Sequence, residues 1–188
     1  IEDLTRYVKH VSRSDIDELR DCIVSTVYIH LRDIDRVSPW ITDSHFTSVS
    51  KDSIDVGRKQ AVHAYYRLTM GQYAQGEAVL AQFETMFSQK GFWALKMNHY
   101  LCLAYCRLAA GDRDGAVRCF WRAYSSTWKN NIVMPFVQWG NDLNSLLDLV
   151  KESSAYDFDE TWLAKVEKMA LVYGCSLYQS DAADDEDR

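Results

Sequence analysis

Turn-forming and basic residues are the scarce components of this sequence. Two prolines and eight glycines are spread over 188 residues, so long helices are allowed along most of the chain. The 21 lysines and arginines form no stripe and are outnumbered by 27 aspartates and glutamates, which gives a net charge of −6. Because binding to nucleic acid requires clustered positive charge, we expect this segment to make no direct contact with nucleic acid.

Signatures of membrane insertion, export and common catalysis are also missing. The sequence has no apolar run of about 18 residues and no charged-then-apolar leader before a cleavage site, so we expect a cytoplasmic protein without a membrane span. A phosphate-binding loop of the form GxxxxGK[ST], a GxSxG nucleophile turn and an HExxH zinc motif are all absent from the sequence. We therefore expect neither an enzyme nor a bound cofactor.

Cysteine occurs in an odd number, scattered through apolar helical patterns, at Cys22, Cys102, Cys106, Cys119 and Cys175. This distribution predicts reduced thiols rather than a disulfide framework. His99, Cys102 and Cys106 share one face of a predicted helix and could hold zinc together with a fourth ligand. Because the surrounding helix is apolar and zinc sites usually gather their ligands from loops, buried thiols are the favoured interpretation.

Helical periodicity accounts for the rest of the chain and predicts an all-α fold. Apolar residues at three- and four-residue steps predict a first helix from Ser14 to just before Pro39, with a core face of Ile16, Leu19, Ile23, Val27, Leu31 and Ile34. A loop is expected over residues 39–52. Further helices are expected over 54–70, 73–88, 92–110, 113–129, from Pro135 onward with a division near Gly140, and over 159–178.

An internal similarity appears when the chain is aligned with itself at an offset of 40 residues. Matching positions include Ala64 with Ala104, Tyr65 with Tyr105, Arg67 with Arg107, Leu68 with Leu108 and Gly71 with Gly111. A fixed offset in this range is typical of stacked helical hairpins that cannot bury their faces alone. The alternative is that two similar hairpins share packing constraints without being repeats.

The second copy resembles the tetratricopeptide pattern of small, aromatic and turn residues, in LA at 103–104, Gly111, AV at 116–117, Phe120 and Ala123. The first copy matches less well, and the unit of 40 residues exceeds the usual length of about 34. The resemblance implies stacked α-α hairpins that form a right-handed superhelical array. We expect a single helical-repeat domain over 1–178, followed by a disordered acidic linker or tail over 179–188.

A second resemblance is carried by four stretches: VSPW (37–40), AYYRLTMGQY (64–73), LAYCRLAAGDRDGAVRCFWRAY (103–124) and MPFVQWGNDLNSLL (134–147). Between Ala64 and Leu147 the chain resembles the helical-repeat region of large bacterial LuxR-type transcription activators of the MalT-like class. The resemblance implies that this region senses an inducer or a partner protein. In that family a nucleotide-binding module and a DNA-binding helix-turn-helix lie elsewhere in the parent protein.

The inner surface of such an array is the expected binding surface, because the first helix of each hairpin lines it. Counting from Ala64 and Ala104, the candidate groove residues are Arg58, Tyr65, Asn98 and Tyr105, continued by Trp139 and Asp142. Tyrosine and arginine suit this role because they combine a large contact area with a polar tip. Alternatively, Tyr65 and Tyr105 are core aromatics between the units, since aromatic residues at helical spacing usually pack.

Two functions follow from these features. The favoured hypothesis is a regulatory signal-sensing and protein-interaction domain of a LuxR-type transcriptional regulator, which binds an inducer or a partner protein in the groove. The alternative is a free-standing tetratricopeptide-like scaffold that binds peptide segments of a partner protein. The sequence identifies neither the inducer nor the partner.

Overall fold

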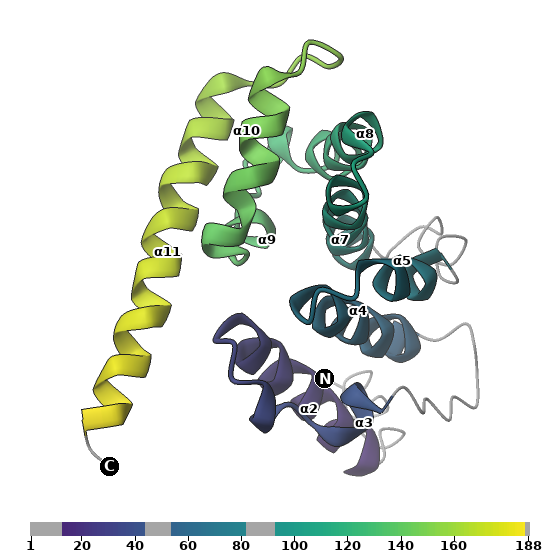
Figure 1. The fold of residues 1–188 in the computed structure, drawn as a ribbon, viewed down its shortest axis with the longest axis vertical. Coiled ribbons are helices and arrows are strands. Elements are labelled where there is room, and N and C mark those ends of the chain that lie inside the picture. Colours follow the sequence, from purple (N-terminus) through teal and green to yellow (C-terminus); the bar gives the residue numbers. More distant parts are fainter. Residues whose placement is uncertain (1–12, 44–53, 82–92, 187–188) are drawn as a thin grey trace, which may run out of the picture.

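The computed structural model describes the backbone of residues 13–43, 54–81 and 93–186, and the side chains of 17–43, 57–81 and 96–175. Every regular element within these ranges is helical, which confirms the all-α prediction (Figure 1). No helix in the described ranges has the length and apolarity needed to cross a membrane. The elements are α2 (Arg13–His30), η1 (Ile34–Arg36), α3 (Pro39–Thr42), α4 (Ile54–Thr69), α5 (Tyr73–Ala81), α7 (Trp93–Ala109), α8 (Arg113–Ser125), η2 (Trp128–Asn130), α9 (Met134–Val137), η3 (Gly140–Leu143), α10 (Asn144–Glu152) and α11 (Glu160–Glu186).

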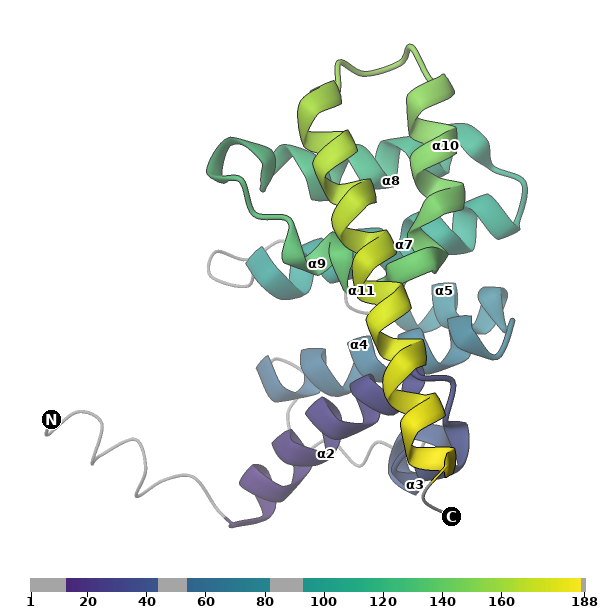
Figure 2. The same ribbon diagram turned by 90° about the vertical axis from the view of Figure 1, so that its left-hand side faces the viewer.

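Helical hairpins are the building blocks of the core. Helices α4 and α5 form one hairpin and α7 and α8 form the next, and both helices of the first hairpin contact α7. Helix α10 packs on α8, and α11 packs on α9 and η3. Figures 1 and 2 show α11 along one side of the molecule, with its C-terminal end at the level of α2 and α3. The two hairpins are therefore direct neighbours, whereas a right-handed superhelical array of tetratricopeptide type stays a prediction.

The two hairpins share the same local geometry at the positions that the 40-residue offset matches. Ala64 and Ala104 are both fully buried in the core. Gly71 and Gly111 both take left-handed backbone conformations, with φ of 71° and 79°. In each turn the glycine amide donates to the carbonyl three residues earlier, and the next amide donates to the carbonyl five residues earlier. This pair of bonds is the Schellman motif, which satisfies the last carbonyls of a helix.

Helix α2 ends earlier than predicted, at His30, and its end repeats this turn. Arg32 takes the left-handed conformation with φ of 63°, and its amide donates to the Ile29 carbonyl at 3.2 Å. The amide of Asp33 donates to the Tyr28 carbonyl at 3.0 Å. Arg32 therefore occupies the place of the glycine in the later turns, 39 residues before Gly71. The prediction of a helix to just before Pro39 is wrong because Arg32 ends the helix instead of continuing it.

The predicted core face of α2 is also wrong. Cys22, Ser25 and Ile29 are buried, whereas Ile23 is 58% exposed and Val27 is 48% exposed. Ser25 lies 39 residues before Ala64, so a small residue stands at the same place of α2 and α4, where the two helices pack together. Small side chains let helices approach closely, and this favours the face with Ser25 over the more apolar one.

The C-terminal elements follow most of the sequence expectations. Pro135 lies in the first turn of α9, and the chain divides at Gly140, whose φ is 52°. Trp162, Val166 and Ala170 of α11 are buried. The backbone of α11 continues to Glu186, beyond the end expected near residue 178 and into the acidic segment. This continuation contains no glycine or proline, the residues that most strongly end a helix.

The remaining boundaries differ by a few residues. A short helix, α3, begins at Pro39 within the segment predicted to be a loop, and residues 44–52 of that segment lie outside the described residues. The helix predicted over 73–88 is described only as far as Ala81. The helix predicted to end near residue 129 ends at Ser125, and the 3-10 turn η2 follows it.

Candidate binding cleft

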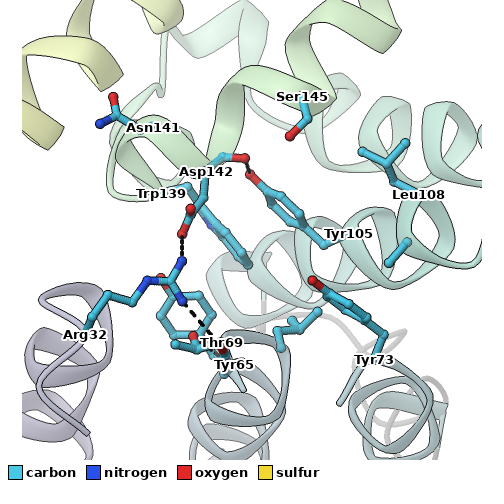
Figure 3. Close-up of a pocket in the computed structure, with 12 residues that line it drawn as sticks. Arg32, Tyr65, Thr69, Tyr73, Tyr105, Leu108, Trp139, Asn141, Asp142 and Ser145 are labelled. Carbon is cyan, nitrogen blue, oxygen red and sulfur yellow. Dashed lines mark hydrogen bonds and ion pairs between the residues drawn. The ribbon is translucent and has the colours of Figure 1, made fainter. Parts of the chain in front are cut away.

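A cleft of about 440 Å³ lies where the C-terminal ends of α2, α4 and α7 face the segment from Trp139 to Ser145 (Figure 3). The last turns of α4 and α7 line the cleft, and Arg32 reaches it from the turn that follows α2. The lining residues are Arg32, Tyr65, Leu68, Thr69, Tyr73, Tyr105, Leu108, Ala109, Trp139, Asn141, Asp142 and Ser145. This set combines an aromatic and aliphatic wall with a few polar groups, which is typical of small-molecule sites.

Three aromatic rings from three segments meet in the wall of the cleft. The Trp139 indole stacks on the Tyr105 ring, with centroids 4.5 Å apart and planes 13° apart. It also meets the Tyr65 ring edge to face at 4.8 Å. The Tyr105 hydroxyl donates to the Asp142 carbonyl, which ties α7 to η3. The aromatic wall is therefore held in place by contacts between α4, α7 and the Trp139–Asp142 segment.

A partly buried hydrogen bond behind this wall joins α4 to α2. The Tyr65 hydroxyl lies 2.6 Å from His30 Nδ1. Burial lowers the pKa of His30 to about 4, with a further contribution from the Arg32 charge. Burial also raises the pKa of Tyr65 well above its ordinary value. At neutral pH the imidazole is therefore neutral, and the tyrosine hydroxyl donates to Nδ1.

One ion pair lies in the cleft. Arg32 Nη2 is 2.6 Å from Asp142 Oδ2, and Nη1 is 3.5 Å from the Thr69 carbonyl oxygen. Both charged side chains are 45% exposed, so solvent screens the pair and its contribution to stability is small. A left-handed conformation costs about 1–2 kcal/mol at a residue with a side chain. Arg32 adopts this conformation despite its cost, whereas glycine avoids the cost in the equivalent turns at Gly71 and Gly111.

A smaller pocket of about 60 Å³ shares Tyr65 and Trp139 with the cleft. Its other lining residues are Thr26, His30, Ala61, Val62, Asn98, Cys102 and Gln138. Gln138 Nε2 donates to Asn98 Oδ1 at 3.2 Å, which links α7 to the end of α9. The indole N–H of Trp139 is buried and has no hydrogen-bond partner among the described residues. Tyr65 and Trp139 therefore form a shared wall between the two spaces.

Five of the six predicted groove residues lie at these two pockets. Tyr65, Tyr105, Trp139 and Asp142 line the cleft, and Asn98 lines the smaller pocket. Arg58 lines neither. Burial raises the pKa of the Cys22 thiol and the charge of Arg58 offsets part of that rise, so Arg58 lies on the side of α4 that faces α2. Tyr65 is only 8% exposed, so it is a core residue and a wall of the cleft at once.

Among the lining residues that the sequence interpretation missed are Arg32, Tyr73, Asn141 and Ser145. Arg32 was placed within the predicted helix that ends before Pro39, because nothing in the local sequence predicts a left-handed arginine. Tyr73 is the first residue of α5, directly after the turn at Gly71. A search of the residues that follow each turn glycine would have found Tyr73.

None of the described cysteines lines the cleft, and Cys102 lines the smaller pocket. Cys22, Cys102, Cys106 and Cys119 are buried and Cys175 is exposed. Burial raises the pKa of Cys22 to about 11 and that of Cys106 to about 12, and it raises the pKa of Cys102 as well. Within the described ranges no group of three or more His, Cys, Asp or Glu side chains is arranged to hold a metal ion. His99, Cys102 and Cys106 are buried side chains of the core.

No family model, curated protein or solved structure matches this chain. The cleft holds stacked aromatic rings, an ion pair and neutral polar groups, an arrangement that provides contact area and hydrogen bonds.

Proposed function

We propose that this chain is a non-catalytic sensory domain that binds a small molecule in the cleft described above. The observation that carries the proposal is the convergence of Tyr65, Tyr105 and Trp139, from three separate segments, on one cleft. A ligand seated there would contact α2, α4, α7 and η3 at the same time. Its binding energy would therefore be coupled to the relative placement of the N-terminal and C-terminal elements.

The state of the polar groups supports binding rather than catalysis. Burial raises the pKa of Tyr65 and of Tyr105 well above the ordinary value, so both hydroxyls stay protonated at neutral pH. The Nδ1 atom of His30 already accepts a hydrogen bond from Tyr65. A general base needs an acceptor free to take a proton from the substrate, and these groups do not provide one.

The size of the cleft favours a small molecule over a peptide. Its volume of about 440 Å³ lies within the range of about 300–1,000 Å³ that is usual for small-molecule sites. The alternative of a free-standing scaffold that binds peptide segments requires a longer groove along the stacked helices.

The resemblance to MalT-like LuxR-type activators supports a role for this sensing in the control of transcription. The prediction is that the gene continues beyond Arg188 into a basic helix-turn-helix. Sequencing the complete coding region tests it, and a stop codon directly after Arg188 would remove the transcriptional role while leaving the binding proposal intact.

A thermal-unfolding screen against a metabolite panel tests the binding proposal. Ala109 is exposed in the wall of the cleft, so Ala109→Trp should fill it. Ala78, exposed on α5 and outside the lining, provides the matched control Ala78→Trp. A ligand at a hundred times its dissociation constant adds about 2.7 kcal/mol of stability. We expect this gain in the wild type and in Ala78→Trp but not in Ala109→Trp. An equal gain in all three proteins would contradict the cleft as the binding site.

A further inference from the structure

The charges of the cleft point to the class of ligand. Arg32 and Asp142 are the only charged residues among the described residues that line it, and they form an ion pair at 2.6 Å. Figure 3 shows this pair on one side of the cleft, with Tyr73 and Leu108 on the other. The cleft therefore has a dipolar end and an aromatic and aliphatic end.

The backbone at Arg32 supports a role for its side chain beyond the turn itself. Gly71 and Gly111 close the same Schellman turn without a side chain, whereas Arg32 closes it with φ of 63°. Strained residues persist where the surrounding structure holds them in place, and they cluster at ligand-binding and active sites. Its guanidinium reaches Asp142 and the Thr69 carbonyl from this position.

We infer that the cleft binds a small zwitterion, an α-amino acid with an aromatic or large aliphatic side chain. This inference rests on the proposed function and names the ligand class of that site. The ligand carboxylate would pair with Arg32 and its ammonium group with Asp142. Its side chain would lie toward Tyr73, Tyr105 and Leu108.

A zwitterion is favoured over other ligands because it can pair with Arg32 and Asp142 at the same time. A ligand with one charge must separate Arg32 from Asp142 and leave one of them without its partner ion. A zwitterion replaces both halves of the pair with charge-assisted hydrogen bonds. A neutral ligand would use neither group.

Four probes separate these possibilities: L-phenylalanine, N-acetyl-L-phenylalanine, L-phenylalaninamide and N-acetyl-L-phenylalaninamide. They carry both charges, only the carboxylate, only the ammonium group and neither. The readout is the indole N–H signal of Trp139 in a proton–nitrogen NMR spectrum, assigned by its loss in Trp139→Phe. The indole of Trp162, buried against Phe136 and Tyr124 outside the lining of the cleft, is the internal control. We expect L-phenylalanine to shift the Trp139 signal saturably, with a dissociation constant at least about tenfold below those of the other three probes.

Two variants make the test specific to the ion pair. Arg32→Gly introduces the residue found in the two equivalent turns, so the fold should be retained while the carboxylate partner is lost. Asp142→Asn should weaken L-phenylalanine at least about tenfold and strengthen N-acetyl-L-phenylalanine, because Arg32 is then free to bind its carboxylate.

The outcomes separate the ligand class from the cleft itself. Equal affinity for all four probes, or tightest binding of the neutral probe, would overturn the zwitterion inference and leave the cleft as a binding site. No shift of the Trp139 signal by L-phenylalanine up to its solubility limit would also overturn it. The metabolite screen with Ala109→Trp would then decide the proposed function independently.

Discussion

Removal of the Tyr65–His30 hydrogen bond should show how much this bond contributes to holding α2 against the wall of the cleft. Tyr65→Phe leaves the buried Nδ1 atom of His30 without its donor, and His30→Leu leaves the Tyr65 hydroxyl without its acceptor. Each single change should lower the free energy of unfolding by about 1–3 kcal/mol. The double variant removes both polar groups, so its loss should be smaller than the sum of the two, with a coupling of about 1 kcal/mol.

The same pair predicts a defined dependence on pH. The pKa of His30 falls from 6.5 in the unfolded chain to about 4 in the folded protein. Because the folded pKa is the lower one, the unfolded state binds the proton first as the pH falls. Stability is therefore unaffected above about pH 7 and is lost between about pH 6.5 and pH 4. Between about pH 7.5 and pH 5 the loss due to His30 is about 2 kcal/mol.

Urea denaturation at both pH values measures these quantities. His99, whose pKa burial also lowers to about 4, contributes a similar loss in every variant and cancels in the comparison. We expect the double variant His30→Leu/Tyr65→Phe to lose about 2 kcal/mol less than the wild type on acidification. Additive single changes together with an unchanged acid sensitivity would refute the buried, neutral state assigned to His30.

Three further predictions concern the frame around the cleft. Gly71→Ala and Gly111→Ala should each lower the free energy of unfolding in urea by about 1 kcal/mol. A Cβ at either position meets no atom within 4 Å, so only the left-handed backbone conformation opposes the alanine. Clearly unequal losses for the two variants would contradict the matched geometry of the two turns. Gly174→Ala should destabilise the protein by about 1–3 kcal/mol, because its Cβ would come within 3.0 Å of Asn141 Oδ1 and push α11 away from η3. An unchanged midpoint of urea unfolding would contradict this packing. Cys175 should react with a thiol reagent before the four buried cysteines, and simultaneous reaction of all five in the native state would contradict their burial.

Part of the site could be predicted because residues at equivalent positions of two similar hairpins take similar places in the folded chain. Tyr65 and Tyr105 lie one residue after the small Ala64 and Ala104 in neighbouring hairpins, so their similar placement follows from the 40-residue offset. Trp139 and Asp142 were predicted as the continuation of the same surface in the next helical segment, and the structure places both at the cleft. The type of fold and these four positions therefore followed from periodicity.

The rest depended on features that periodicity does not encode. The left-handed conformation of Arg32 is rare for a residue with a side chain, so the sequence suggested a continuous helix through it. Helix α2 carries apolar residues on two faces, and only its packing on α4 selects the face with Ser25. Arg58 was assigned to the groove by counting along α4, but the cleft lies at the other end of that helix.

Native mass spectrometry after exposure to a metabolite extract detects the binding of a small molecule in the cleft. We expect one small-molecule adduct on the wild type and on Ala78→Trp, and none on the cleft-filling variant Ala109→Trp. An adduct of equal intensity on Ala109→Trp, or no adduct on the wild type, would contradict it.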